Sequence, residues 1–209
     1  MNEHTLRSFE TKLREDWEAG KIKVPLHLSG GNERQLLEIF KEVKKDDYVF
    51  STHRNHYHYL LHGGDPMALQ REIYQQDNAL CKGRAGSMCT MDLRRRFIAS
   101  AIVGGICGIA VGTAWALKHR GSRQHAWAFI GDGAVDTGHF WEALRYSQGW
   151  KLPVTFVIED NDRSTCTSVA ERWGSEDIDL ADTEEVSNIR YYYYEPVYPH
   201  VGSGVYVQF

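Results

Sequence analysis

Two nearly continuous apolar runs dominate the hydrophobic pattern in the middle of the chain. They cover residues 126–130 and 154–158, and a segment of helical character, about 138–148, lies between them. Strands of a parallel sheet that is covered on both faces have such continuous apolar runs, and a helix normally connects them. The pattern therefore predicts an α/β fold with a mostly parallel sheet and helices on both faces.

The flanking segments are expected to add helices and short strands. Apolar residues recur at helical spacing over 3–19 and predict an amphipathic helix that ends at Gly20. One domain is expected, with N-terminal helices over 1–47, a core over 48–170 and divergent strands over 171–209. The other expected elements are helices over 32–45 and 66–74, a strand over 48–52, a His-rich loop to about residue 65, a loop over 83–91, an acidic loop or helix over 176–185, and strands over 189–197 and 205–209.

A run without charged residues, 97–117, allows two interpretations. It has basic flanks and the length of a membrane span. More than half of it is Ala, Gly, Ser or Thr, which weakens its transfer free energy, and Gly104, Gly108 and Gly112 form a small-residue stripe that lets another backbone approach closely. A buried core helix is the favoured expectation, and a membrane span is the alternative.

Composition and charge narrow the possible partners. The 209 residues are 42% hydrophobic and 25% charged, which is typical of a globular domain with a core. Lys and Arg number 24 against 28 Asp and Glu, a net charge of −4, so no nucleic-acid partner is expected. Four cysteines lack CxxC spacing, and residues 1–4 lack a signal-peptide pattern, which favours a reducing, cytoplasmic compartment.

Candidate chemistry follows each of the two apolar runs. Asp132 stands between Gly131 and Gly133, which permit close approach of an anion, and Asn161 ends the second run. Ligands of α/β sheets bind beyond the carboxyl ends of the strands, where parallel neighbours would bring these side chains to one edge. Carboxylate and amide oxygens suit Mg²⁺, which could anchor a diphosphate at the following helix. A Gly-Asp-Gly turn used only for its geometry is the alternative.

Several motifs follow one another in order from about Gly20 to Val169. They are HLSGGNE at 27–33, YVFSTHRNH at 48–56, KGRAGSM at 82–88, GDG at 131–133, GHFWEAL at 138–144, WKLPV at 150–154 and EDN at 159–161. Together they resemble the alpha subunit of 2-oxo-acid dehydrogenases, the thiamine diphosphate-dependent decarboxylating component. The resemblance implies a thiamine diphosphate-binding fold.

The resemblance also implies roles around the predicted metal. Asp132 and Asn161 would ligate Mg²⁺ through side-chain oxygens, and the backbone carbonyl of Arg163 would be a third ligand. Gly133 and Ala134 would approach the diphosphate through backbone N–H groups. The metal and the diphosphate would thus share one end of the sheet.

Upstream residues would complete the cofactor site. Arg54 would pair with the diphosphate, and His53 stands at a cofactor-binding position that usually holds an aromatic residue such as Tyr. Backbone groups at Ala101 and Val103 would bind the aminopyrimidine ring. His56 would be the catalytic residue, a proton donor or oxyanion partner beside the substrate. The resemblance thus implies a cofactor site that includes residues from the first half of the chain.

Alternatives remain for these upstream residues. Arg54 could form a surface salt bridge, and His56 could be a solvated loop histidine. The histidines between 53 and 62 also suggest a transition metal, but no carboxylate or cysteine completes a tetrahedral set. In each of these alternatives the residue has no role at the cofactor.

The chain also departs from the family pattern. Cys89 follows Gly-Ser-Met where His is usual, and Asp160 replaces the first Asn of Glu-Asn-Asn. Beyond Val169 no counterpart is found for the family's closing loop, and His200 receives no role. These departures therefore affect the expected catalysis more than the expected cofactor geometry.

The expected function is a magnesium-dependent oxidoreductase subunit that decarboxylates a 2-oxo acid such as pyruvate or a branched-chain acid, with acyl transfer to lipoyl. The glutamate that activates the pyrimidine would lie on a beta-type partner, which implies an α2β2 heterotetramer with no membrane or nucleic-acid partner. The alternatives are a non-catalytic or regulatory homologue, because the closing loop is missing, and a transketolase-like half-protein.

Overall fold

The computed structural model describes residues 1–174 and 187–207. The chain forms two compact units, each built from separate stretches of sequence. The first unit comprises 1–46, 51–101 and the C-terminal segment from Glu195, and the second comprises 47–50 and 102–194. The expected acidic segment over 176–185 lies outside the described residues.

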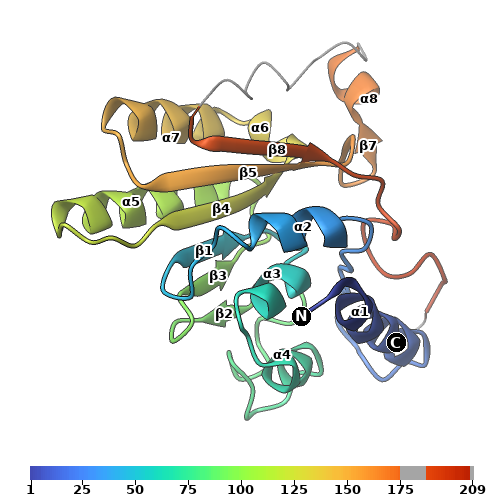
Figure 1. The fold of residues 1–209 in the computed structure, drawn as a ribbon. Helices are drawn as coiled ribbons and strands as arrows, with labels where there is room; N and C mark the ends of the chain where they lie inside the picture. Colours follow the sequence, from blue (N-terminus) through green and yellow to red (C-terminus); the bar gives the residue numbers. More distant parts are fainter. Residues whose placement is uncertain (175–186, 208–209) are drawn as a thin grey trace. The chain divides into compact units, whose positions relative to one another are not determined.

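Parallel strands form the centre of the second unit (Figure 1). Their order is β1 (Tyr48–Ser51), β4 (Ala126–Gly131), β5 (Val154–Asp160) and β8 (Ile189–Tyr193). Every residue of β4 up to Ile130, and of β5 up to Glu159, is buried. Because successive side chains of a strand point to opposite faces, both faces of these strands are covered. The predicted α/β fold with a mostly parallel sheet is confirmed.

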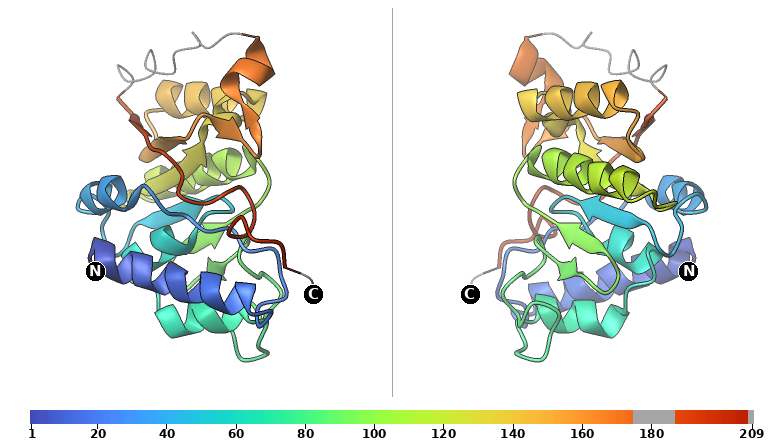
Figure 2. Two further views of the ribbon diagram at one scale, coloured as in Figure 1. Left: turned by 90° about the vertical axis from the view of Figure 1, so that its right-hand side faces the viewer. Right: turned by 90° about the vertical axis from the view of Figure 1, so that its left-hand side faces the viewer.

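Helices and one small hairpin follow these strands. They are α5 (Gly105–His119), α6 (Asp132–Val135), α7 (Gly138–Gly149), β6 (Arg163–Ser164), β7 (Thr167–Ser168) and α8 (Val169–Trp173). Helices α5 and α7 pack against each other, and α5 also contacts β4 (Figure 2). Thr137 caps α7 by accepting a hydrogen bond from the Phe140 N–H. The strand–helix–strand unit that the apolar runs predict is therefore present.

The uncharged run is not one helix. Its first residues form β3 (Phe97–Ala99), and α5 begins only at Gly105, after Gly104 adopts φ +71°. A Cβ atom on Gly104 would lie 2.6 Å from Thr137 Oγ1, so the turn requires glycine. Only one side of α5 is buried, and Ile109 and Trp115 on the other are 49% and 44% exposed. Among the described helices, none has the length and apolar character needed to cross a bilayer.

The first unit consists of helices and a short hairpin. The elements are α1 (Glu3–Glu18), α2 (Glu33–Ile39), α3 (His56–Leu61), α4 (Pro66–Ile73), β2 (Met91–Asp92) and β3, which pairs antiparallel with β2. Asn2 caps α1, which buries Leu6, Leu13 and Trp17 as its period predicts.

Two expectations for this unit's helices were wrong: helix α2 ends before 45, and α3 lies in the segment expected to be a His-rich loop. Helix α3 forms because its side chains pack into the core of the unit, and Tyr57 and Tyr59 are each 1% exposed.

The C-terminal segment joins the first unit without forming the strand expected over 205–209. Residues 205–207 are not in a strand, and 208–209 lie outside the described part. The segment runs past the 26–30 stretch, where the Gly202 N–H donates to the Leu26 carbonyl at 2.7 Å and the Tyr198 ring contacts Gly30. Gly202 also lies against the Trp17 ring, near the end of α1. The segment is thus packed on the stretch that carries His27.

Candidate functional site

The carboxyl ends of β4 and β5 bring two predicted ligands to one edge of the sheet. Gly131 and Glu159 are paired in register, so Asp132 and Asn161 each follow at the same end of their strand. Asp132 is 1% exposed and opens α6. The sequence argument for a shared edge is confirmed for these two residues.

Asp132 is a buried carboxylate with one oxygen left over. Its Oδ2 accepts a hydrogen bond from Arg172 Nη2 at 2.9 Å, whereas its Oδ1 is buried without a hydrogen-bond partner among the described residues. Burial raises the pKa of Asp132 to about 6, with Arg172 opposing and Asp160 adding to the shift. The unpartnered oxygen is therefore a place where a cation would stabilise the ionised form.

Arg172 is a part of this edge that the sequence analysis missed. It belongs to α8, and its Nε also lies 3.0 Å from Asp136 Oδ2, so one guanidinium joins two carboxylates. A signal was present, because Ser168 and Glu171 form a capping box that marks the start of α8. The pattern predicts the helix but not which carboxylate its arginine reaches.

Asn161 is held in a fixed orientation by its neighbours. Its Nδ2 donates to the Tyr194 hydroxyl at 3.0 Å, and its Oδ1 accepts from the Arg163 N–H at 3.1 Å. Asp162 between them has φ +58°, which bends the chain into the hairpin that starts at Arg163. The Arg163 side chain is exposed. Asn161 Oδ1 is thus held near the end of β5 with a second lone pair that can still contact a ligand.

The loop after Asp132 leaves no room for a side chain. A Cβ atom on Gly133 would lie 2.5 Å from Ser164 Oγ, so the hairpin approaches the bare backbone. Ala134 is 3% exposed. The first N–H groups of a helix have no acceptor within it, and those of α6 include Gly133 and Ala134. These N–H groups fit the predicted contact with a diphosphate.

Ala101 and Val103 lie on either side of an exposed turn before α5. Val103 is 50% exposed, and the Gly105 N–H donates to the Ile102 carbonyl at 3.0 Å. Their predicted contact with the aminopyrimidine through backbone groups stays a prediction.

Arg54 lies in the first unit and is held by backbone carbonyls. Its guanidinium donates to the carbonyl of Leu28 and, at 3.2 Å, to that of Pro199. Among the described residues no carboxylate forms an ion pair with it, so the surface salt bridge considered for this residue is not seen there. Within the described ranges, its positive charge therefore has no anionic partner.

Three histidine rings from distant parts of the sequence meet beside Arg54. We call His27, His53 and His200 the histidine cluster; their ring centroids lie 5.0 to 5.2 Å apart. Burial lowers the pKa of His27 to about 4 and of His53 to about 3, and it also lowers that of His200. The rings are therefore neutral near pH 7.

The cluster leaves two ring nitrogens unsatisfied. His27 Nδ1 and His53 Nε2 are buried without a hydrogen-bond partner in the part of the chain described. Within that part, no group of three His, Cys, Asp or Glu side chains has the geometry to hold a metal ion. No local sequence signal could have placed His200 here, because tertiary packing alone brings residue 200 to residues 27 and 53.

His56 lies in the core of the first unit rather than in a solvated loop. It is 0% exposed; its Nδ1 donates to Glu10 Oε1 at 3.0 Å, and its Nε2 lies 2.9 Å from Ser87 Oγ. Glu10 and Ser87 also accept hydrogen bonds from the N–H groups of Ser29 and His27. His56 thus supports the stretch that carries His27. Its predicted catalytic role stays a prediction.

Comparison with known proteins identifies the protein family to which this chain is similar. A family model described as "Dehydrogenase E1 component" matches residues 1–190. The alpha subunit of acetoin:2,6-dichlorophenolindophenol oxidoreductase from Cupriavidus necator is 38% identical over 165 residues, 78% of this chain and 50% of that subunit. The pyruvate dehydrogenase E1 component subunit alpha of Rickettsia prowazekii is 35% identical over 166 residues, 79% and 51% of the two chains.

The chain belongs to the dehydrogenase E1 component family, since the family model matches most of its length. It spans about half the length of the curated relatives it matches. The family resemblance drawn from the motifs is confirmed, and the match favours a dehydrogenase over the transketolase-like alternative.

Proposed function

We propose that this chain is the alpha-type subunit of a thiamine diphosphate- and Mg²⁺-dependent 2-oxo-acid dehydrogenase, acting on pyruvate or a branched-chain acid with acyl transfer to lipoyl. The observation that carries the proposal is the buried, unpartnered Oδ1 of Asp132 at the end of β4. A buried carboxylate is costly unless a cation compensates it, and Arg172 contacts only the other oxygen. A divalent ion at Oδ1 would meet this need.

The residues present fit the metal and the diphosphate. Asp132 Oδ1, Asn161 Oδ1 and the Arg163 carbonyl offer three hard oxygen ligands of the kind Mg²⁺ prefers. Gly133 must lack a side chain because Ser164 packs against it, and its backbone N–H belongs to the first turn of α6, where it can donate to an anion. Gly131, which precedes α6 in extended conformation, turns the chain into these N–H groups. This sheet edge can therefore bind a metal–diphosphate group.

Residues outside this edge have proposed cofactor roles of their own. When bound, thiamine diphosphate supplies a carbon nucleophile for the carbonyl of a 2-oxo acid. Arg54 would contribute positive charge to the diphosphate, which requires it to exchange the Pro199 carbonyl for a phosphate oxygen. Ala101 and Val103 would orient the pyrimidine through their backbone, and His53 would line the cofactor. His56 is proposed as a proton donor or oxyanion partner beside the substrate. This role requires the first unit to open, because His56 Nε2 contacts Ser87 Oγ, which already accepts a hydrogen bond from the backbone N–H of His27.

A beta-type partner is part of the proposal. The pyrimidine-activating glutamate would come from that chain, in an α2β2 assembly. The uncovered side of α5 supports it, because Gly108, Ile109, Gly112 and Trp115 are exposed there. Small and apolar residues on one helix side allow close packing against another subunit. We place the complex in the cytoplasm, which the four free cysteines support.

Calorimetry tests the metal-dependent binding. The chain with its beta-type partner is titrated with thiamine diphosphate, with and without Mg²⁺. Asp132→Asn should weaken Mg²⁺-dependent binding by at least a hundredfold, about 2.7 kcal/mol. Glu142→Gln, a matched change on the exposed side of α7, should leave it within twofold. Wild-type affinity in Asp132→Asn would contradict the proposal.

A non-catalytic homologue is the second candidate, and one contact favours it. The Arg54 guanidinium is already bound to Leu28 and Pro199, and the C-terminal segment that carries Pro199 lies beyond the family match. Decarboxylation of pyruvate or a branched 2-oxo acid by the reconstituted pair would exclude this candidate. Cofactor binding without turnover would support it.

A further inference from the structure

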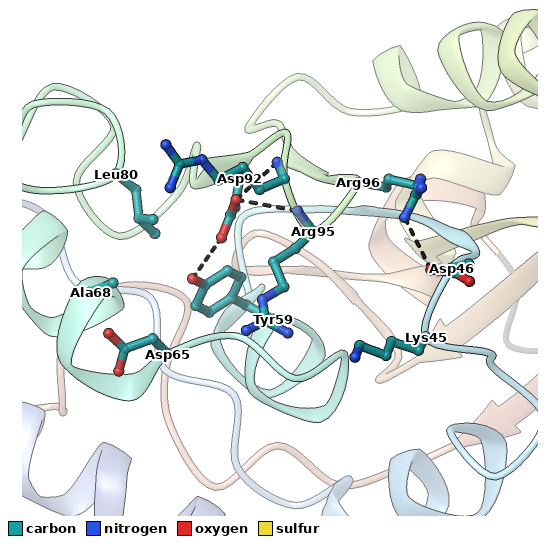
Figure 3. Close-up of a pocket in the computed structure, with 10 residues that line it drawn as sticks. Lys45, Asp46, Tyr59, Asp65, Ala68, Leu80, Asp92, Arg95 and Arg96 are labelled. Atoms are coloured by element: carbon teal, nitrogen blue, oxygen red, sulfur yellow. Dashed lines mark hydrogen bonds and ion pairs between the residues drawn. The ribbon is translucent and has the colours of Figure 1, made fainter.

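The turn between β2 and β3 presents three consecutive arginines to a cavity in the first unit. The cavity has a volume of about 450 Å³, and Arg94, Arg95 and Arg96 line it together with Lys45 (Figure 3). This volume is within the range of small-molecule sites. None of its lining residues belongs to the proposed cofactor site.

Hydrogen bonds fix the arginine turn in place. Asp92 Oδ1 accepts from the N–H groups of Arg94 and Arg95 at 3.1 and 3.3 Å, and its Oδ2 accepts from the buried Tyr59 hydroxyl at 3.1 Å. His62 Nε2 donates to the Arg95 carbonyl at 2.8 Å. Because the turn is held to α3 and to the residue after it, the Arg95 side chain starts from a fixed backbone. Such preorganisation lowers the entropy cost of binding.

The carboxylates that line the cavity already have partners. Asp46 pairs with Arg96 at 3.4 Å, and the two oxygens of Asp92 are used as described. Asp65 caps α4 by accepting from the Met67 N–H at 3.0 Å, and it lies 3.9 Å from Arg71. Each of these carboxylates is therefore already hydrogen-bonded or ion-paired within the protein.

Two cations at the cavity lack such partners. Within the described residues, neither the Lys45 ammonium nor the Arg95 guanidinium has an acceptor, and Figure 3 shows the two side chains pointing towards one another beside Tyr59. Like charges that converge on a cavity favour an anion between them, and an arginine with a lysine matches the charge of a phosphate dianion.

The remaining wall of the cavity is apolar. Leu80 and Ala68 line it beside the nearly buried ring of Tyr59, and Leu80 is the most exposed of the three. An organic group attached to the anion could cover this wall. We propose that the cavity binds a small phosphate monoester, with its phosphate between Lys45 and Arg95 and its organic part against Tyr59, Ala68 and Leu80.

Titration calorimetry of the full chain with phenyl phosphate, without Mg²⁺ or thiamine diphosphate, tests this site. We expect one saturable site that binds phenyl phosphate more tightly than inorganic phosphate and does not bind phenol. Arg95→Gln should weaken binding at least tenfold and Lys45→Gln at least threefold. Arg34→Gln, an equal charge change on the exposed side of α2, should stay within twofold of the wild type.

Four results would overturn the proposal in whole or in part. The first is absence of phenyl phosphate binding by the wild type, and the second is unchanged binding in both Arg95→Gln and Lys45→Gln. The third is loss of binding in Arg54→Gln but not in Arg95→Gln, which would place the probe at the residues proposed for the cofactor. Equal affinity for phenyl phosphate and inorganic phosphate would refute the apolar subsite. Lys45 is exposed, so its variant keeps the test valid if Arg95→Gln fails to fold.

Discussion

The sheet edge and the surroundings of the histidine cluster each contain a charged side chain that is only partly satisfied, the Asp132 carboxylate in the first and the Arg54 guanidinium in the second. At the sheet edge, a buried carboxylate oxygen has no partner among the described residues. Beside the cluster, the only partners of the Arg54 guanidinium in the described part of the chain are carbonyls, and the three imidazoles around it are neutral near pH 7. The first environment therefore attracts a cation and the second an anion. Each region thus favours a ligand of the opposite charge to its own.

The two regions also differ in how they are supported. Asp132 is positioned by strand ends, local turns and a single ion pair with Arg172. The histidine cluster depends on the buried Glu10–His56–Ser87 network, which fixes the backbone of His27 and Ser29. Changes to that network should therefore reduce the stability of the whole first unit.

The largest expected effect comes from His56→Leu. This change leaves the buried Glu10 carboxylate without its imidazole partner and should lower the free energy of unfolding by about 3–5 kcal/mol. Urea denaturation measures it, and His4→Leu at the exposed start of α1 is the matched control, expected within about 0.5 kcal/mol of the wild type. A loss below about 1 kcal/mol would show that His56 does not support the cluster.

The second prediction concerns the pH dependence of the sheet edge. The pKa of Asp132 is raised from 3.8 to about 6, so the folded state binds more protons than the unfolded state between these values. Stability from this group is therefore present at low pH and falls by about 3 kcal/mol as the pH rises from 4 to above 6. Urea midpoints of wild type and Asp132→Asn, compared from pH 4 to 7, measure it.

Two further measurements make this prediction specific. Glu142→Gln should retain the wild-type slope, and Mg²⁺ should restore stability above pH 6 in the wild type but not in Asp132→Asn. Parallel pH curves for wild type and Asp132→Asn would refute the raised pKa.

The sequence predicted the sheet edge better than the histidine cluster for a physical reason. Asp132 and Asn161 each follow a buried strand, and parallel pairing of neighbouring strands then places them at one edge. Arg172 could be assigned to a helix but not to Asp132, since that contact depends on how the hairpin before α8 turns. His200 reaches His27 only through the fold of the first unit, which no local pattern encodes.

The smallest expected effect comes from His200→Phe, which keeps a ring in the histidine cluster but removes the titratable imidazole. Each histidine of the cluster has a lowered pKa, so the unfolded state binds more protons and stability falls as the pH drops below 6.5. This change of stability with pH is opposite in direction to the one expected for Asp132.

At pH 7.5 the His200→Phe variant should stay within about 1 kcal/mol of the wild type, because ring packing is kept. Between pH 6.5 and 4 it should lose less stability than the wild type, whereas His119→Phe, at the end of α5, should follow the wild type. If His200→Phe also follows the wild type, the ring of residue 200 is not part of the cluster in solution, and the neutral environment beside Arg54 would rest on His27 and His53 alone.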